Sequence, residues 1–373
     1  MKLILHRFDL PLRHVFRISR ESISTQPTLI VELQADGHSG FGEATTNNYY
    51  GFTYENMAAT LDAVRDKIEG WSLENPADFW QAMHPLLGDN PFAQCALDQA
   101  AHDLWGKQRN QPVYRLWGLQ AENMPLTNYT IGIDEIDVMV AKMSEFPDWP
   151  VYKIKLGTEH DLEIVQALRE HTKATFRVDA NCGWEVDETI CNSVALKELN
   201  VEFVEQPLVA DRWDDMKRVH AESALPIIAD ESCIVPADVD RCAGHFHGIN
   251  IKLVKCGGLT PARQMIARAR ELEMRVMVGC MTESSVGISA IAQLLPLLDY
   301  VDMDGALLLA EDIATGITVD QGVCHYAAEN GCGVRLVAPT NDAASYTVWS
   351  GYSELTFAIR IAAHRHDAVY PDV

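Results

Sequence analysis

The sequence Val151-Tyr152-Lys153-Ile154-Lys155-Leu156-Gly157 decides how the rest of the chain is interpreted. It has the pattern of a short buried strand that ends at a glycine. Lys153 and Lys155 are two residues apart, so on a strand both project from one face, with Cα atoms about 7 Å apart. Two partly buried ammonium groups at this distance lower each other's pKa, as a lysine base requires. Taken alone, the pattern also fits an exposed strand with two solvated lysines.

Length and composition describe an acidic protein of ordinary hydrophobicity. The 373 residues are enough for a barrel plus a smaller domain. Thirty Lys and Arg against 53 Asp and Glu give a formal charge of −23, which argues against nucleic acid and anionic membranes as partners. Nine single cysteines without a C-x-x-C pair, and an N-terminus without a signal-peptide pattern, predict a cytoplasmic protein. We also expect a homo-oligomer.

The first 124 residues predict an α+β capping domain. Alternating and β-rich segments, with a turn at Asp36-Gly37-His38, predict an antiparallel sheet. Residues 16–25, with alternating charges at Arg17, Arg20 and Glu21, are expected to form a loop between two strands. Helical patterns follow at residues 54–71, 77–87 and 92–117.

Residues 125–318 predict a (β/α)8 barrel. Short apolar runs alternate with helical runs at intervals near 25 residues, which is typical of a parallel sheet with crossover helices. Eight such units indicate a closed barrel. An open doubly wound sheet is the alternative, but no G-x-G-x-x-G follows any strand. Residues 319–373 are expected to return to the cap. The predicted strands are 127–133, 151–156, 175–179, 201–205, 226–230, 248–253, 275–279 and 300–304.

Polar side chains stand at the carboxyl ends of these strands, where the active sites of barrels form. Asp179, Glu205 and Asp230 end three consecutive strands. One such carboxylate is usually a helix cap, but three together make a negative cluster that is costly without a cation. All three offer hard oxygen ligands, with no His or Cys among them, which favours Mg²⁺ over Zn²⁺. The sequence therefore predicts a Mg²⁺ site.

Two lysines are predicted to face each other across the barrel mouth. Lys155 ends the second strand and Lys252 the sixth, and strands four apart are opposite in a ring of eight. One base on each face of a carbon is what inversion by proton transfer requires. One lysine would remove the α-proton, the cation would stabilise the enediolate, and the other lysine would return a proton.

The motifs at the strand ends carry a resemblance. They are K-I-K at 153–155, D-A-N at 179–181, V-E-Q-P at 204–207, A-D-E-S at 229–232 and N-I-K-L-V-K-C-G-G at 250–258. With G-F-G-E at 40–43, they resemble the enolase superfamily, muconate-lactonizing enzyme subgroup, over residues 1 to about 335. The resemblance implies that Lys155 and Lys252 are the acid/base pair, that Asp179, Glu205 and Asp230 bind the metal, and that Lys153 assists at the substrate carboxylate. Lys255 lies in the same motif, but the family's base matches Lys252.

Within the subgroup, Asp302-Met303-Asp304 resembles the D-x-D motif of dipeptide epimerases. Two carboxylates on one strand face can hold the ammonium group of a dipeptide. Cycloisomerases and succinylbenzoate synthases have no substrate ammonium to hold. The alternative is that one Asp caps the next helix. The resemblance implies an isomerase that inverts the α-carbon of the second residue of a dipeptide.

Glu21 is the candidate residue for specificity. In this subgroup a loop of the cap covers the barrel mouth, and epimerases of acidic dipeptides typically carry an arginine there. The position that matches this arginine holds Glu21, which would repel an acidic side chain and attract a basic one. We therefore expect Lys or Arg as the second residue of the dipeptide. The alternative is that Glu21 pairs with Arg17 or Arg20 in a solvated loop.

Other functions on the same scaffold remain open. A muconate cycloisomerase or an o-succinylbenzoate synthase-like lyase is the main alternative. Sugar-acid dehydratases usually place a His at the end of the seventh strand, where this chain has Cys280-Met281-Thr282-Glu283. A binding barrel without catalysis would not need three clustered carboxylates and two opposed lysines. Residues 334–373 have no explanation within the family.

Overall fold

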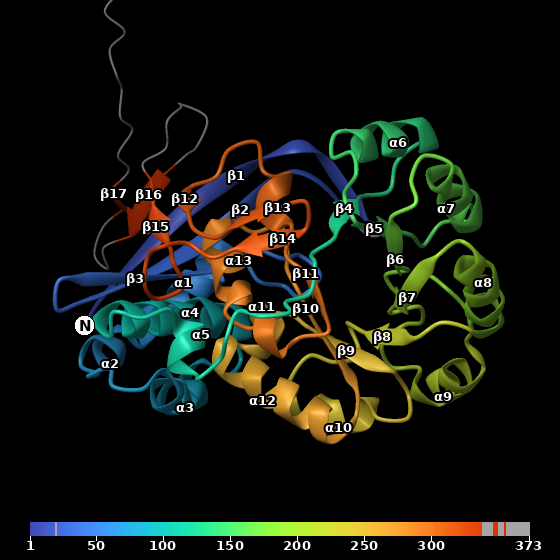
Figure 1. Ribbon diagram of the computed structural model, residues 1–373. Coiled ribbons are helices and arrows are strands. Elements are labelled where there is room, and N and C mark those ends of the chain that lie inside the picture. Colours follow the sequence, from blue (N-terminus) through green and yellow to red (C-terminus); the bar gives the residue numbers. More distant parts are fainter. Residues whose placement is uncertain (19–20, 338–345, 350–353, 356–373) are drawn as a thin grey trace, which may run out of the picture.

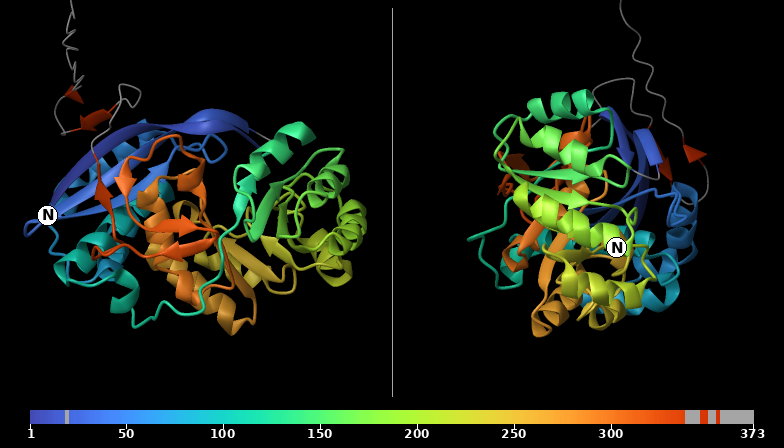
Figure 2. Two further views of the ribbon diagram at one scale, coloured as in Figure 1. Left: turned by 45° about the horizontal axis from the view of Figure 1, so that its top comes forward. Right: turned by 90° about the vertical axis from the view of Figure 1, so that its right-hand side faces the viewer.

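The computed structural model describes residues 1–18, 21–337, 346–349 and 354–355. It consists of an antiparallel sheet with helices, which caps an eight-stranded parallel barrel (Figure 1). Figure 2 shows the two parts side by side, with the blue cap strands reaching over to the green barrel segment. Among the described helices, none is long and apolar enough to cross a lipid bilayer.

The cap is built on a three-stranded antiparallel meander. Its strands are β1 (Lys2–Ile18), β2 (Glu21–Ala35) and β3 (His38–Thr45), and Asp36 and Gly37 take positive φ at the β2–β3 turn. The predicted helical segments each exist, but two of them are interrupted. The cap helices are α1 (Tyr54–Ala63), α2 (Arg65–Glu69), α3 (Pro76–Leu87), α4 (Pro91–Gln108) and α5 (Val113–Leu116).

The prediction of a loop at residues 16–25 was wrong. β1 runs to Ile18 and β2 starts at Glu21, so the two strands continue as a paired ribbon. Phe16 pairs with Ile23 and Ile18 with Glu21, after an irregularity in the pairing that follows Pro11. Arg17 pairs with Ser22 and Glu21 pairs with Ile18, so Arg17 and Glu21 lie on opposite faces of this ribbon, because cross-strand partners share a face and successive side chains alternate. Arg20 lies outside the described residues.

The barrel has the predicted eight strands in the predicted order. They pair in parallel from β4 to β11, and a parallel bridge between Thr127 and Val301 joins the two ends. The strands are β4 (Tyr129–Ile131), β5 (Val151–Lys155), β6 (Thr175–Asp179), β7 (Val201–Glu205), β8 (Ile227–Ala229), β9 (Gly248–Ile251), β10 (Arg275–Gly279) and β11 (Tyr300–Asp302).

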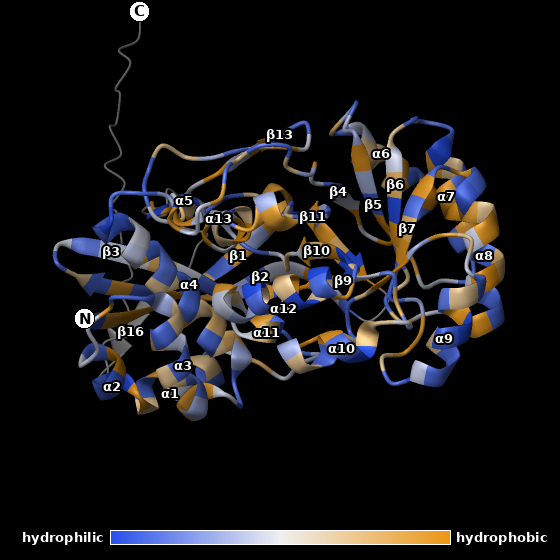
Figure 3. Ribbon diagram, turned by 60° about the horizontal axis from the view of Figure 1, so that its bottom comes forward, coloured by the Kyte–Doolittle hydropathy of each residue, from blue (hydrophilic) through white to orange (hydrophobic). Residues whose placement is uncertain are grey.

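Helices cover the outside of the barrel. Figure 3 shows hydrophobic strands inside and helices α8 and α9 with mixed hydrophilic and hydrophobic faces outside. This is the pattern of helices that bury one stripe against a sheet. The helices are α6 (Ile136–Ser144), α7 (Asp161–Arg169), α8 (Val186–Glu198), α9 (Trp213–Glu222), α10 (Val239–Cys242), α11 (Leu253–Cys256), α12 (Leu259–Glu271) and α13 (Ser285–Ala292), with 3₁₀ turns at Pro236–Asp238, Leu295–Leu297 and Gly305–Leu308.

The cap is attached to the barrel around its mouth. The Ile133 amide donates to the Arg17 carbonyl (2.9 Å), and the Ala310 amide donates to the Pro11 carbonyl (2.8 Å). These bonds fix the far end of the β1–β2 ribbon over strands β4 and β11, as the blue ribbon in Figure 1 shows. The ribbon therefore forms a roof over the carboxyl ends of the barrel strands.

The chain after the barrel contacts the cap again. The Lys107 ammonium donates to the Val334 carbonyl (2.8 Å), and the Cys332 amide donates to Asp103 of α4 (2.7 Å). The boundaries at residues 124 and 318 stay predictions. The last strands are β12 (Ala314–Thr315), β13 (Thr318–Asp320), β14 (Val323–His325), β15 (Arg335–Leu336), β16 (Tyr346–Trp349), which pairs with β1, and β17 (Glu354–Leu355).

Candidate functional site

A cavity of about 630 Å³ lies between the barrel mouth and the cap. This volume is in the range of sites for small molecules. Residues of the cap ribbon and of the segment 45–50 form its roof, and the strand ends form its floor. The floor residues are Thr130, Lys155, Asn181, Asp230, Glu231, Lys252, Cys280, Met281, Thr282, Asp302 and Asp304.

The three predicted metal ligands lie together beneath this cavity. Asp179, Glu205 and Asp230 are buried, and an oxygen atom of each lies within 4.8 Å of the others. β6, β7 and β8 are neighbours in the ring, so the three side chains converge because each stands at the end of its strand. Burial and the charge of Asp179 raise the pKa of Glu205 to about 7, which reflects the crowding of negative charge.

This donor set fits a hard divalent cation. All three groups are carboxylates, and oxygen-only sites are the preferred surroundings of Mg²⁺. A buried oxygen beside them, Oδ1 of Asn181, has no hydrogen-bond partner among the described residues. Asn181 lies on the cavity wall two residues after Asp179 and takes a positive φ of 46°. An unsatisfied buried oxygen at this place is a further acceptor for a cation or its water.

The two opposed lysines reach the cavity from opposite sides of the ring. Lys155 ends β5 and Lys252 follows β9, and these strands are four apart in the sheet. The Lys155 ammonium lies 2.7 Å from Asp179, and the Lys252 ammonium lies 2.9 Å from Asp230. Each lysine is thus oriented by a different carboxylate of the cluster, and both line the cavity.

Lys153 lies deeper than the other two lysines. Its ammonium contacts Glu205 and Asp302 at 2.8 Å each and Asp179 at 3.3 Å, and the side chain is 1 % exposed. It is absent from the described cavity lining. Its contacts make it a bridge between the carboxylate cluster and the eighth strand. Its assistance at a substrate carboxylate stays a prediction.

The expected lowering of the pKa is not found at Lys153. Burial lowers the pKa of Lys153, but the charges of Asp302, Glu205 and Asp179 outweigh this and hold the pKa well above its ordinary value. Burial also lowers the pKa of Lys252, but the charge of Asp230 outweighs burial, so this pKa is raised as well. Other strands bring carboxylates within contact distance of Lys153 and Lys252, and a neighbouring negative charge raises the pKa of a lysine.

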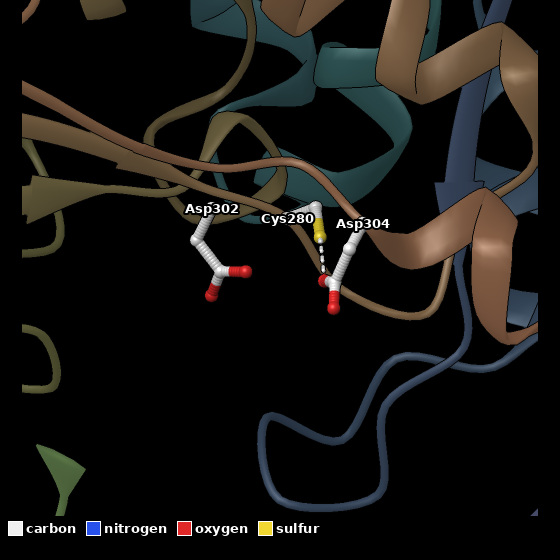
Figure 4. A group of neighbouring side chains, drawn as sticks. All are labelled: Cys280, Asp302 and Asp304. Atoms are coloured by element: carbon white, nitrogen blue, oxygen red, sulfur yellow. Dashed lines mark hydrogen bonds between the residues drawn. The ribbon is translucent and has the colours of Figure 1, made fainter. Parts of the chain in front are cut away.

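Asp302 and Asp304 project side by side into the cavity (Figure 4). Asp302 accepts hydrogen bonds from Lys153 and from Asn128, both at 2.8 Å. Asp304 stands just beyond β11 at the start of a 3₁₀ turn, but its side chain does not cap that turn. It accepts the Thr130 amide at 2.5 Å instead, and the Cys280 thiol lies 3.9 Å away.

The two carboxyl groups differ in charge. Burial acts against ionisation of Asp302, but the charge of Lys153 outweighs it and holds the pKa far below its ordinary range. Burial and the neighbouring charge of Asp302 raise the pKa of Asp304 to about 8. Asp304 therefore carries a proton at neutral pH until a cation arrives beside it.

Glu21 lines the cavity from the cap ribbon. Its carboxylate accepts a hydrogen bond from the Asn48 side chain at 2.8 Å. Among the ion pairs of the described residues, none joins it to Arg17. Arg20, the other partner suggested for Glu21, lies outside the described residues. Glu21 is thus placed on the wall of the cavity.

Sequence reasoning missed the importance of Lys255. Its ammonium contacts the Asp230 carboxylate at 2.5 Å and the Asp230 carbonyl at 2.6 Å, and the side chain is fully buried. Lys252 is the N-cap of the short helix α11, so Lys255 stands one helical turn later on the same side. The three-residue spacing of the two lysines in N-I-K-L-V-K indicates, already in the sequence, that both side chains lie on one side of a helix. Together they hold Asp230 from two directions.

A second carboxyl pair lies behind the cavity wall. Burial and the charge of Glu43 raise the pKa of Glu283 to about 8. Oε1 of Glu283 accepts the Met281 amide at 2.7 Å, and its buried Oε2 has no hydrogen-bond partner among the described residues. The fold therefore favours the neutral form of Glu283, whose ordinary pKa is 4.5.

We expect Glu283→Gln to stabilise the protein at alkaline pH. The carboxyl of Glu283 ionises near pH 4.5 when unfolded and near pH 8 when folded, so its contribution to stability is complete below pH 4.5 and is lost as the pH rises through 8. The loss is at most roughly 5 kcal/mol. Thermal unfolding between pH 5 and 9 should show a smaller decline for Glu283→Gln than for wild type and for the exposed control Glu198→Gln. Equal declines would contradict this assignment.

Comparisons with known proteins agree with the fold. Residues 3–118 match the mandelate racemase/muconate lactonizing enzyme N-terminal domain, and residues 138–340 match the enolase C-terminal domain-like family. The chain is 60 % identical to an L-Ala-D/L-amino acid epimerase of Flavobacterium johnsoniae over 337 residues, which cover 90 % of this chain and 100 % of the relative.

Solved structures resemble the whole of both domains. A dipeptide epimerase from Cytophaga hutchinsonii, complexed with Mg and D-Ala-L-Val, has a TM-score of 0.86 at 25 % identity and covers 93 % of this chain and 100 % of its own. A dipeptide epimerase from Methylococcus capsulatus, complexed with Mg and L-Arg-D-Lys, has a TM-score of 0.82 at 33 % identity, covering 90 % and 99 %. The chain therefore belongs to the mandelate racemase/muconate lactonizing enzyme family of the enolase superfamily and is an isomerase of the racemase and epimerase class.

Proposed function

We propose that this protein is a Mg²⁺-dependent dipeptide epimerase that inverts the α-carbon of the second residue. The observation that carries the proposal is the arrangement of Lys155 and Lys252 on opposite sides of the cavity, with the carboxylate cluster between them. Relatives with this activity and solved complexes with dipeptides support it. The test is epimerisation of an Ala-X dipeptide library, followed by deuterium uptake at the α-carbon in heavy water.

The two lysines act as the acid and the base. With the α-carbon held between them, the neutral form of one lysine takes the α-proton while the ammonium of the other donates a proton to the opposite face. The intermediate is the enediolate of the dipeptide carboxylate. The carboxylates that contact each lysine, Asp179 and Asp230, keep the two nitrogen atoms fixed on their own sides. Fixed positions on opposite faces make the outcome inversion.

Asp179, Glu205 and Asp230 would hold the Mg²⁺ ion. When bound, the ion neutralises negative charge that develops on the substrate carboxylate oxygens. Lys153, which contacts all three of Asp179, Glu205 and Asp302, adds a fixed positive charge beneath the same place. We assign to Lys153 the supporting role at the substrate carboxylate.

Asp302 and Asp304 would bind the free ammonium group of the dipeptide. An ammonium between two buried carboxylates makes charge-assisted hydrogen bonds, and removal of one partner of such a pair costs several kcal/mol. We expect Asp304→Asn to raise KM by about 100-fold or more, which corresponds to about 2.7 kcal/mol. N-acetylated dipeptides should be poor substrates of the wild type. Steady-state kinetics with free and acetylated Ala-X pairs measures both effects.

The pH dependence distinguishes this role from a structural one. Because burial and Asp302 raise the pKa of Asp304 to about 8, kcat/KM should rise with pH toward about pH 8 and fall above it, where the α-amino group of the dipeptide loses its proton. Asp304→Asn should lose this rise. Equal turnover of N-acetylated and free dipeptides would exclude the ammonium role and favour the cycloisomerase alternative, whose substrates carry no ammonium group.

Glu21 leads us to propose a cationic second residue. Its carboxylate lies on the cavity wall with Asn48 as its hydrogen-bond partner, in the cap ribbon above the reacting centre. A negative group at this place favours a basic side chain and disfavours an acidic one. We expect the wild type to prefer Ala-Lys to Ala-Glu by about tenfold in kcat/KM, a difference of about 1.4 kcal/mol.

The substitution Glu21→Arg should reverse this preference, because the charge at the cavity edge changes sign. Glu185→Arg, at an exposed position outside the cavity lining, is the matched control for a change of net charge. The measurement is kcat/KM for Ala-Lys and Ala-Glu in all three proteins. A wild-type preference for Ala-Glu would refute the proposal, as would unchanged selectivity in Glu21→Arg.

A muconate cycloisomerase or o-succinylbenzoate synthase-like lyase remains the alternative on this scaffold. These reactions need a carboxylate site and a lysine but no site for an ammonium group. The pair of Asp302 and Asp304, both on the cavity wall, favours the dipeptide. The homo-oligomer and the cytoplasmic location stay predictions.

A further inference from the structure

The motif Gly40-Phe41-Gly42-Glu43 has no part in the chemistry proposed above, yet it ends in a fully buried carboxylate. Glu43 lies on β3 of the cap, and 0 % of its surface is exposed. The glycines explain the close packing around it. A Cβ at Gly42 would lie 2.1 Å from the Ala96 carbonyl oxygen of α4, so only glycine allows β3 to lie against that helix.

Glu43 binds a part of the barrel that is 241 residues further along the chain. It accepts the Ser284 hydroxyl at 2.6 Å and the Ser284 amide at 3.1 Å. It also accepts the Gly287 amide at 3.0 Å. On the cap side, the Thr28 hydroxyl donates to it at 2.9 Å. A buried carboxylate with donors on both of its oxygen atoms is held in one orientation.

These barrel donors stand directly behind the cavity wall. Ser284 is the N-cap of α13, and Cys280, Met281 and Thr282, immediately before it, line the cavity. This segment also contains an internal hydrogen bond, which the Met281 amide donates to the Glu283 side chain. Cys280 in turn contacts Asp304, one of the two residues assigned to the substrate ammonium (Figure 4). A shift of this segment would therefore change the wall beside Asp304.

We propose that Glu43 is a positioning residue for the substrate cavity: it holds the segment 280–284 at the end of β10 in place from the cap. This inference rests on the proposed function, because it assigns the segment to the substrate-binding wall. Glu43 does not reach the cavity itself and touches no reacting atom. Its effect is transmitted through Ser284 and the start of α13.

Two substitutions test the proposal. Glu43→Gln keeps the shape but replaces one acceptor oxygen by an NH2 group. The Ser284 amide lies within hydrogen-bond distance of both carboxylate oxygens, so in either orientation of the glutamine it faces a group that can only donate. Ser284→Ala keeps the carboxylate and removes the shortest of its bonds. Glu32→Gln is the matched control, since Glu32 is a buried carboxylate of the same sheet whose partners His6, Gln34 and Ser39 all belong to the cap.

The first measurement needs no substrate. Each protein is treated with N-ethylmaleimide, and the labelled cysteines are identified by mass spectrometry. We expect Glu43→Gln to raise the labelling rate of Cys280 about tenfold over wild type and over Glu32→Gln. Cys191 is exposed, so its labelling shows whether all samples received the same amount of active reagent. Cys95 is buried in the cap core, so its labelling indicates general unfolding.

The second measurement is steady-state kinetics with an Ala-X dipeptide. We expect Glu43→Gln to raise KM about tenfold while kcat falls less than threefold, with Glu32→Gln unchanged in both. The double variant Glu43→Gln/Ser284→Ala should add little to either single variant, because both act through one contact. Unchanged Cys280 labelling together with unchanged KM overturns the proposal.

The remaining outcomes also support or overturn the proposal. If Cys95 becomes labelled in Glu43→Gln, that variant has lost its fold, and Ser284→Ala is judged by the same two criteria. Equal effects of Glu32→Gln and Glu43→Gln on KM overturn the proposal, because they mean general destabilisation of the cap. A wild type that epimerises no dipeptide contradicts the proposed function, while the labelling still reports whether Glu43 holds the segment.

Discussion

Lys155→Ala should lose epimerase activity by roughly 10³-fold or more, yet still exchange the α-proton of one dipeptide epimer with deuterium from the solvent. The reason is the position of the two lysines. Lys155 comes from β5 and Lys252 follows β9, on opposite sides of the eight-stranded ring. Removal of one leaves the other able to serve its own face. Lys252→Ala should show the opposite epimer preference.

The experiment follows two signals in the same sample. Proton NMR in heavy water measures loss of the α-proton signal from each separate epimer, and polarimetry or chiral chromatography measures inversion. Lys197→Ala, at an exposed position on α8, is the control and should behave as wild type. Exchange of both epimers at equal rates by either single variant would show that one group serves both faces, and the two-base mechanism would then be wrong.

Removal of the metal should abolish turnover, and Mg²⁺ should restore it. Asp179, Glu205 and Asp230 bring three buried carboxylates to within 4.8 Å of one another, and such a cluster of negative charge is stabilised by a hard cation. Without the cation, the negative charge that develops on the substrate has only the lysines to stabilise it. We expect Asp179→Asn, Glu205→Gln and Asp230→Asn each to lower kcat/KM by about 10³-fold or more.

Metal binding is to be measured apart from activity. Mn²⁺ in place of Mg²⁺ allows titration by electron paramagnetic resonance, and each of the three variants should bind it more weakly. Asp214→Asn, a fully exposed carboxylate on α9, is the matched control. Full activity after exhaustive chelation, or unchanged Mn²⁺ affinity in all three variants, would exclude this cluster as the metal site.

Much of the barrel and its site could be predicted from local patterns. The eight strands follow from apolar runs repeated with helical segments between them, and the observed strands fall within the predicted ranges. Once the barrel is assumed, the residue at the end of each strand is known, and Asp179, Glu205 and Asp230 must meet at one mouth. The opposition of Lys155 and Lys252 follows from the same counting.

Other features depend on contacts between distant parts of the chain. The segment 16–25 looks like a solvated loop, but β1 and β2 pair along it, and its far end is fastened to the barrel by the Ile133 and Arg17 backbones. The pKa of Lys153 follows from the same cause. Lys153 has carboxylates from β6, β7 and β11 around it, so its pKa is raised and not lowered.

The sequence by itself therefore determined the strands, their order and which side chains stand at their ends, because these depend on periodicity and on the geometry of a parallel ring. Only the tertiary structure decided the surroundings of each group. Asp304 is bound by Thr130, 174 residues earlier, and Glu43 by Ser284, 241 residues later. Such contacts set charge and orientation through distances of a few ångströms between different strands, and no local pattern in the chain encodes those distances.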